Sequence, residues 1–304
     1  MTPIAVIARS DRAAEMDSPI FFLIQVLNGV QYGLLLFLVA SGLTLVFGIM
    51  GIVNLAHGSF YMVGAYLAYA LAQATGSLWL AIALAVPLAI VLGLALERLF
   101  RPLYGRDHLY QVLLTYGLIL VLEEGRSLIF GDEVHGVAIP AILDRSLKLT
   151  ADLSYPVYRL AISATCLALA AAMYLVIAKT RLGMAIRAGS ANREMVQSLG
   201  IDVGLIFRIV FAAGVVLAAF AGMIAAPIAT VYPGMGNEIL ILSFVVVIIG
   251  GIGSVKGAFL GALLIGLADT FSQVLAPSYA GMTVYVLMAA VLLWRPAGLF
   301  GRRA

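Results

Sequence analysis

The stretch IFFLIQVLNGVQYGLLLFLVASGLTLVF fills residues 20–47 and contains no Asp, Glu, Lys or Arg. An α-helix needs about 20 mostly apolar residues to cross the hydrocarbon core of a bilayer. This stretch is longer than that, and it lacks the short apolar core and small-residue cleavage site of a secretory signal. It predicts an uncleaved first transmembrane helix behind a polar amino-terminal tail at residues 1–19.

Composition extends this prediction to the whole chain. Of 304 residues, 63% are hydrophobic and 11% are charged, whereas an ordinary soluble domain has about 25% charged residues. A soluble core of this size must still be covered by polar side chains, so contact with lipid has to replace the missing charge. The net charge of +3 comes from short basic clusters between apolar runs, which favours a role in membrane orientation over nucleic-acid binding.

Eight further apolar segments follow, at residues 58–75, 78–100, 109–130, 157–178, 205–230, 238–252, 257–275 and 280–294. The segment at 238–252 is short for a full crossing, and Gly and polar residues interrupt the stretch at 48–60. Both regions are therefore expected to be broken or re-entrant helices. The predicted fold is an all-α, polytopic transmembrane helix bundle with discontinuous helices and seven to nine full spans.

Charges in the connecting segments predict the orientation, because cytoplasmic loops collect Lys and Arg. The connections at 98–106 and 179–204 are basic, whereas the connection at 131–156 and the tail at 1–19 carry more acids than bases. We therefore expect the amino terminus outside and the carboxyl terminus in the cytoplasm. The predicted divisions are the tail at 1–19, a transmembrane domain at 20–295 with a cytoplasmic segment at about 181–204, and a cytoplasmic tail at 296–304.

A weak internal repeat relates the two interrupted regions. Residues 51–60, GIVNLAHGSF, are similar to residues 251–259, GIGSVKGAF, with one residue deleted. Each copy places a polar break at the start of an apolar helix, as transporters do when they position discontinuous helices near the midplane; chance similarity among Gly-rich helices is the alternative. Asn54 and His57 either pair across helices and pin the break or line a wet path. The predicted substrate-path residues are Asn54, His57, Gly58, Gly251, Gly253 and Gly257.

No catalytic motif is present. The chain lacks a GxxxxGK[ST] phosphate loop, an HExxH zinc motif and a GxSxG nucleophile motif. Its three histidines lie in different segments, and the single cysteine, Cys166, allows no intramolecular disulfide. We therefore expect no catalytic residues, no metal site, no cofactor and no enzyme activity in this chain by itself.

Three groups of charged residues lie in or beside the apolar segments. Glu123 and Arg126 at i, i+3 predict an ion pair near the outer end of their helix, and Glu97 with Arg101 at i, i+4 predicts a pair at a cytoplasmic helix end. Asp269 is the most isolated acid. Its expected role is a structural hydrogen bond or ion pair, with lining of a substrate path as the alternative.

The basic linker contains a predicted short helix at 191–199 that ends at Gly200. Met195, Val196 and Leu199 form one apolar stripe on it. Such a stripe offers a ridge to a groove on a cytoplasmic partner. The alternative is a helix that lies on the bilayer surface.

From about residue 24 onward the chain resembles the permeases of branched-chain amino acid ABC importers, of the shorter, H-type subunit. The order and spacing of several short motifs carry the resemblance. These are Gly42-Leu43 with Gly48, Asn54-Leu55-Ala56-His57-Gly58, Glu97-Arg98 before Arg101-Pro102-Leu103, Thr115-Tyr116-Gly117, Gly183-Met184-Ala185-Ile186-Arg187-Ala188, Leu199-Gly200-Ile201, Gly250-Gly251-Ile252-Gly253-Ser254 with Gly257, and Arg295-Pro296-Ala297-Gly298-Leu299-Phe300-Gly301. The chain departs from the family at Val196, where alanine is usual, and at Lys256, where several members have proline.

The resemblance implies a multi-pass protein of the bacterial inner membrane that works in a complex. The implied partners are a homologous permease subunit, two cytoplasmic ABC ATPases that bind ATP and Mg, and a periplasmic or extracellular substrate-binding protein. The segment that would couple to the ATPases includes Arg187, Ala191, Met195, Val196, Leu199 and Gly200. Urea or short amides are the alternative substrates, and an ion-gradient-driven secondary transporter is the alternative from another class.

Overall fold

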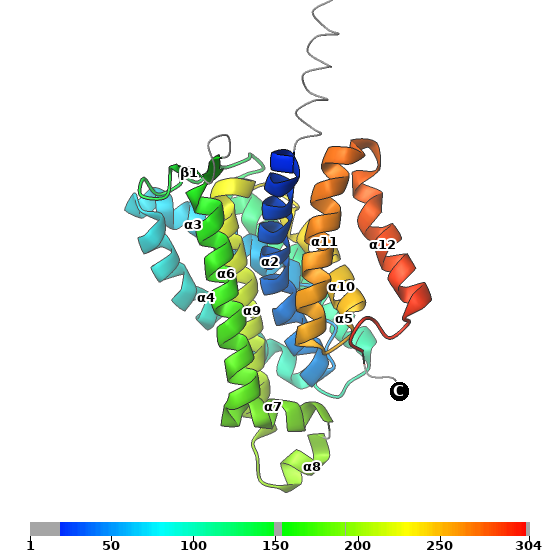
Figure 1. Cartoon of the computed structure of the whole chain (residues 1–304). Helices are drawn as coiled ribbons and strands as arrows, with labels where there is room; N and C mark the ends of the chain where they lie inside the picture. The colour runs from blue at the N-terminus through cyan, green and yellow to red at the C-terminus, as the bar shows by residue number, and fades with distance from the viewer. Residues whose placement is uncertain (1–18, 149–153, 192, 302–304) are drawn as a thin grey trace, which may run out of the picture.

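The computed structural model describes residues 19–148, 154–191 and 193–301. Within these ranges the chain is an almost entirely helical bundle (Figure 1). The predicted tail at 1–19, apart from its last residue, lies outside the described residues, as do 302–304. The long helices are α2 (Pro19–Met50), α3 (His57–Thr75), α4 (Leu78–Phe100), α5 (His108–Phe130), α6 (Val157–Lys179), α9 (Val203–Ala229), α10 (Met235–Gly250), α11 (Val255–Leu275) and α12 (Ala280–Trp294).

Each of the nine predicted apolar segments is therefore a helix, with ends within three residues of those predicted. The predicted and observed bounds agree because a helix in lipid must hydrogen-bond all its backbone groups internally, so each long apolar run forms a helix along its length. The sequence did not predict the small antiparallel hairpin in the connection between α5 and α6. The short elements are η1 (Arg101–Leu103), β1 (Ser146–Lys148), β2 (Ser154–Pro156), α7 (Arg181–Ala191), α8 (Arg193–Ser198) and η2 (Pro277–Tyr279).

In the described part of the chain, six helices are long and apolar enough to cross a membrane. They are α2, α4 continued by η1, α6, α9, α11, and α12 together with η2. Helix α10 has 16 residues and falls short of this length, as its sequence predicts. The structure thus confirms a polytopic all-α membrane protein.

Burial separates the central helices from those that face lipid. The most apolar window of α2 is 83% buried inside the protein, whereas that of the last span is 6% buried. Helix α9 packs against α2, α3 and α4, and α2 packs against α9, α10 and α11. In Figure 1, α4 and α12 lie at the two sides of the bundle. The apolar faces that these outer helices expose are suited to a hydrocarbon environment.

Both predicted breaks are present, and at both the chain turns back. The residue after α2 is Gly51 with φ +66°, and the residue after α10 is Gly251 with φ +94°, a left-handed conformation that favours glycine. A Cβ added to Gly48 would lie 2.7 Å from the Cα of Gly253. The end of α2 therefore touches the second break directly.

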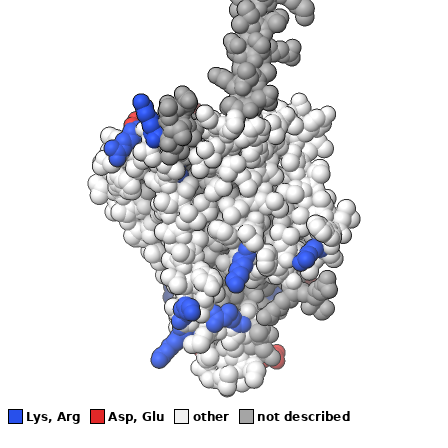
Figure 2. Space-filling model, viewed as in Figure 1, with Lys and Arg blue, Asp and Glu red and all other residues white. Residues whose placement is uncertain are grey.

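The bundle has two chemically different ends (Figure 1). The β-hairpin end carries the start of α2 and the β1–β2 hairpin. The α7–α8 end carries the two short helices of the basic linker and the carboxyl-terminal residues. Figure 2 shows a wide uncharged surface between the two ends, with most of the visible Lys and Arg in the half that holds α7 and α8.

One predicted ion pair is corrected by the structure. Glu97 was expected to pair with Arg101 at i, i+4, but Glu97 faces the protein interior whereas Arg101 is exposed, although the Arg101 amide still donates to the Glu97 carbonyl as in an α-helix. Glu97 is 1% exposed. Its carboxylate accepts a hydrogen bond of 2.9 Å from the Tyr104 hydroxyl and lies 3.8 Å from Nε of Arg208 on α9.

The other predicted pair is confirmed. The Nε atom of Arg126 lies 3.4 Å from a carboxylate oxygen of Glu123, one turn earlier on α5. The same guanidinium donates hydrogen bonds of 3.0 Å to the exposed carboxylate of Asp132 in the following loop. The hydrogen bond from Arg126 lowers the pKa of Asp132 below its usual value. This cluster ties the end of α5 to the loop that leads toward the β-hairpin.

Candidate functional site

A polar cavity of about 420 Å³ opens among the helices near the β-hairpin end. Its walls come from α2, α3, α6, α9, α10 and α11, so six helices remote in sequence share one space. The polar lining residues are Gln25, Asn28, Gln31, Tyr32, Tyr61, Arg159, Asp269, Thr270 and Gln273. The apolar lining residues are Leu35, Val39, Ala225, Ile228, Ala229, Ile239 and Val274. Polar groups in a membrane bundle typically mark a substrate or ion path.

The wall between α2 and α6 is a hydrogen-bonded network. Strand β2 leads directly into α6, which places Tyr155 just before the helix and Arg159 in its first turn. The Tyr155 hydroxyl donates to Oδ1 of Asn28 at 2.9 Å, and Arg159 Nη1 donates to the same oxygen at 3.1 Å. Arg159 Nη1 also donates to Oε1 of Gln31 at 3.4 Å. Burial raises the pKa of Tyr155, so its phenol remains a donor at neutral pH.

The part of the wall that α11 contributes carries an acid. Asp269 on α11 accepts a hydrogen bond of 2.7 Å from Nε2 of Gln273, one turn later on the same helix. The predicted structural hydrogen bond of Asp269 is thus present, and the carboxylate also lines the cavity. The neighbouring hydroxyl of Tyr232, beyond the cavity, donates to Glu238 at 2.7 Å, and burial with this hydrogen bond raises the pKa of Tyr232 to about 12.

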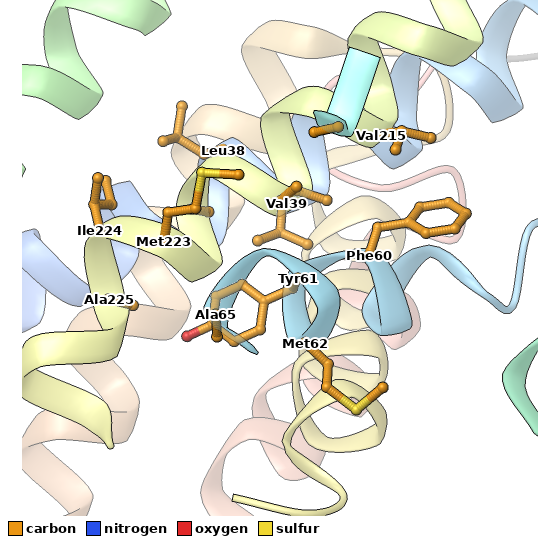
Figure 3. Close-up of a cluster of buried hydrophobic side chains, with 14 of the residues drawn as sticks. Leu38, Val39, Phe60, Tyr61, Met62, Ala65, Val215, Met223, Ile224 and Ala225 are labelled. Carbon is orange, nitrogen blue, oxygen red and sulfur yellow. The ribbon is translucent and has the colours of Figure 1, made fainter. Parts of the chain in front are cut away.

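The floor of the cavity is apolar and tightly packed. Figure 3 shows Tyr61 of α3 beside Val39 of α2, with its ring directed toward α9 near Ala225. Phe60 and Met62, the neighbours of Tyr61, point away from it into other parts of the core. Of these three consecutive residues, only Tyr61 lines the cavity.

Asn54 and His57 are fully buried and lie outside this cavity, in the first break. Asn54 Oδ1 accepts a hydrogen bond of 3.1 Å from the Ala56 amide, and the His57 Nε2 atom lies 2.9 Å from the carbonyl oxygen of Val39. A proton on Nε2 would be donated to that carbonyl. Both side chains therefore pin the chain reversal between α2 and α3, one of the two roles expected for them.

The four predicted path glycines serve helix contact. Gly58 packs on the Gly236 backbone, and Gly257 packs on Gly250. Gly251 lies against Gly301, and Gly253 lies against Gly48. None of these glycines lines the polar cavity. Their assignment to the substrate path stays a prediction. In the structure each of the four glycines packs backbone against backbone.

The second candidate site is the linker at the α7–α8 end. Helix α8 lies within the predicted helix at 191–199, and Gly200 has φ +79°, which ends it. Met195 and Leu199 are exposed, at 62% and 70%. Val196 was predicted on the same exposed stripe, but it is 3% exposed and packs on Val203 and Phe207 at the start of α9.

The same linker is anchored to α6 through α7. Arg187, a predicted coupling residue, donates a hydrogen bond from Nη1 to the Ile177 carbonyl near the end of α6. Ala191 is the last residue of α7, and Asn192 lies outside the described residues. Helices α7 and α8 are thus attached to α6 on one side and α9 on the other.

Apart from Asp269, the residues that build the cavity were not predicted from the sequence. A signal was available on α2, because Gln25, Asn28 and Tyr32 recur at spacings of three and four and therefore share one helix face. Asp269 and Gln273 repeat this spacing on α11. No group of three or more His, Cys, Asp or Glu side chains in the described residues is arranged to hold a metal ion.

A bundle of membrane-spanning helices around a polar cavity, with two chain reversals meeting at its other end, defines a multi-pass membrane transport protein. More narrowly, the chain belongs to the family described as branched-chain amino acid transport system / permease component, whose model matches residues 25–292.

Comparison with curated proteins supports the same assignment. The chain is 30% identical to the high-affinity branched-chain amino acid transport system permease protein BraD of Pseudomonas aeruginosa over 299 residues, which covers 92% of this chain and 96% of BraD. It is 30% identical over 302 residues to LivH of Escherichia coli K12, with 93% and 96% covered. It is 28% identical over 292 residues to a probable LivH of Methanocaldococcus jannaschii, with 90% and 91% covered. No solved structure matches the chain significantly.

Proposed function

We propose that this chain is the translocation subunit of an ATP-driven importer for branched-chain amino acids. The relatives are named as permease proteins of branched-chain amino acid transport systems. The sequence contains no phosphate-binding loop, so ATP and Mg would be bound by separate subunits. The described residues form membrane-crossing helices and a polar cavity, which suits passage of a small polar solute.

The proposed complex contains a homologous permease subunit, two ABC ATPases and an external binding protein. The α7–α8 end carries many of the basic residues, which supports a cytoplasmic location for it in the bacterial inner membrane. In this orientation the amino terminus lies outside, the carboxyl terminus lies in the cytoplasm, and the polar cavity lies toward the binding protein.

The observation that carries the proposal is the projection of α7 and α8 beyond the bundle (Figure 1). The outward side of α8 presents Met195 and Leu199, while Val196 on the other side packs on α9. A partner that pushes on α8 would therefore move α9. Because α9 packs against α2 and α3, which line the cavity, such a movement would change the cavity as ATP is bound and hydrolysed.

The test replaces Leu199 with Asp. If Leu199 inserts into a groove on the ATPase, the new carboxylate would be buried without a partner at that contact, at a cost of several kcal/mol. We expect Leu199→Asp to insert in the membrane and assemble with the sister permease, but to lose ATPase co-purification, substrate-stimulated ATP hydrolysis and uptake together. Gln197→Asp is the matched control, because Gln197 is exposed on the same short helix two residues away and points to another side.

Two results would contradict the proposal. ATPase binding and stimulated hydrolysis that are unchanged in Leu199→Asp would remove α8 from the coupling contact, in favour of a helix that lies on the membrane surface. Gradient-driven uptake by the purified chain alone in liposomes, without any ATPase, would identify a secondary transporter. Calorimetry of the binding protein against a solute panel would separate amino acids from urea and short amides.

A further inference from the structure

Two opposite charges face the polar cavity from different helices. Arg159 projects from α6 and Asp269 from α11, and both line the same space. Arg159 donates to the neutral oxygens of Asn28 and Gln31 and lies beside the neutral hydroxyl of Tyr155, and Asp269 accepts from the neutral amide of Gln273. Neither charge has an ion-pair partner among the described residues. Charges within a membrane bundle are costly unless they serve a ligand or pair with one another.

The side chain of Gln31 provides an independent sign of a ligand. Gln31 is 2% exposed and lines the cavity. Its Oε1 atom is used by Arg159, but no hydrogen-bond acceptor in the described residues contacts its buried Nε2 group. A buried donor without a partner costs about 1–3 kcal/mol. An acceptor that enters the cavity beside Arg159 would satisfy this donor.

Apolar side chains complete the cavity next to these charges. Leu35 and Val39 lie on the same helix as Gln31, one and two turns further along. Ile228 of α9 and Ile239 of α10 line the cavity as well. The cavity volume of about 420 Å³ falls in the range of about 300–1,000 Å³ that is typical of small-molecule sites.

We propose that this cavity binds the zwitterionic backbone of an α-amino acid. Arg159 and the free Nε2 group of Gln31 hold the carboxylate, Asp269 holds the ammonium group, and the apolar side chain of the substrate lies against Leu35, Val39 and Ile239. Guanidinium–carboxylate and carboxylate–ammonium contacts are charge-assisted, so they favour a zwitterion over an uncharged solute such as urea. The inference rests on the transport function proposed above and assigns residues to its substrate site.

The test uses the complete transporter in proteoliposomes, with leucine as the probe and leucine-loaded binding protein at saturation. Arg159→Gln and Asp269→Asn remove one charge each with little change of shape. We expect each to lower the maximal rate of ATP-driven leucine uptake about tenfold or more, the factor for loss of one charge-assisted hydrogen bond. The apparent KM for loaded binding protein, which reports docking, stays unchanged. Arg159→Lys, which keeps the charge, restores part of the rate.

Arg145→Gln and Asp144→Asn are the matched controls. Both residues are exposed in the connection before the β-hairpin, at the same end of the bundle, and neither lines the cavity. They repeat the two charge changes without touching the proposed site, so their maximal rates should equal that of the parent.

A second measurement does not depend on the folding of any variant. A leucine analogue with a side-chain diazirine is carried by the unmodified transporter during turnover and activated by light, and the adducts are mapped by mass spectrometry. We expect adducts on the α2 peptide that contains Leu35 and Val39. Two results would overturn the cavity assignment and leave the transport function standing, provided that the unmodified complex shows ATP-driven uptake. One is a set of adducts confined to other regions, and the other is Arg159→Gln and Asp269→Asn with the same rates as the controls. No ATP-driven leucine uptake by the unmodified complex would instead overturn the transport function.

Discussion

The contact between the two chain reversals can be tested with one methyl group. In Gly48→Ala, the added Cβ would lie 2.7 Å from the Cα of Gly253. Non-bonded carbon atoms pack at about 3.5–4.0 Å, so the end of α2 and the second break would have to separate by about 1 Å. Overpacking of this kind costs about 1–3 kcal/mol. Alanine in a helix also gains about 0.5–1 kcal/mol over glycine, so the net loss should be about 1–2 kcal/mol.

The assay heats the purified complex in one detergent and measures, at each temperature, how much of its size-exclusion elution peak remains. Gly117→Ala is the control, because Gly117 also lies within a helix, and a Cβ there would meet no atom within 4 Å. We expect Gly48→Ala to lower the midpoint by about 2–4 °C and Gly117→Ala to leave it unchanged or raise it slightly. A midpoint for Gly48→Ala at or above that of Gly117→Ala would show that the two reversals are not in tight contact.

Three further predictions follow from other contacts. Gly58→Leu or Gly257→Leu should abolish uptake, because each glycine packs so closely on the backbone of another helix that a side chain would force the two helices apart. Normal uptake in both would remove these segments from the transport cycle. Ser190→Cys should react with a membrane-impermeant thiol reagent only from the cytoplasm and Ser146→Cys only from outside, and the reverse pattern would invert the orientation. Tyr158→Phe removes a buried hydrogen bond of 2.9 Å to the α9 backbone and should cost about 1 kcal/mol, seen as a lower thermal midpoint.

The helices could be predicted from sequence because lipid imposes a strict rule on them. Each apolar run must form its own backbone hydrogen bonds, so length and hydropathy alone locate the nine long helices. The positions of the two chain reversals could also be predicted, because Gly51 and Gly251 interrupt apolar runs where a left-handed backbone is needed. These features are local, and the sequence near each one contains the necessary information.

Side-chain contacts between different helices could not be predicted from the local sequence. Arg101 was the expected partner of Glu97 by spacing, but burial of Glu97 brings Arg208 of α9 to it instead. Val196 shares an apolar stripe with Leu199, yet it packs on its own chain. Periodicity identifies which residues share a face of a helix, but it does not tell whether that face meets another part of the same chain, a partner or lipid. The polar cavity is formed by six helices together, so periodicity within any one of them does not predict it.

The two breaks differ in what covers the end of the helix before each of them. A helix end leaves backbone carbonyls without intrahelical partners. At the end of α10, the Leu299 amide donates to the Ile249 carbonyl at 2.8 Å and the Phe300 amide donates to the Gly250 carbonyl at 3.1 Å. The carboxyl-terminal segment thus covers the second break, whereas a Cβ on Gly51 at the first break would meet no atom within 4 Å. The second reversal is thus held by α2 on one side and by the carboxyl-terminal segment on the other, whereas the first is pinned from within by Asn54 and His57.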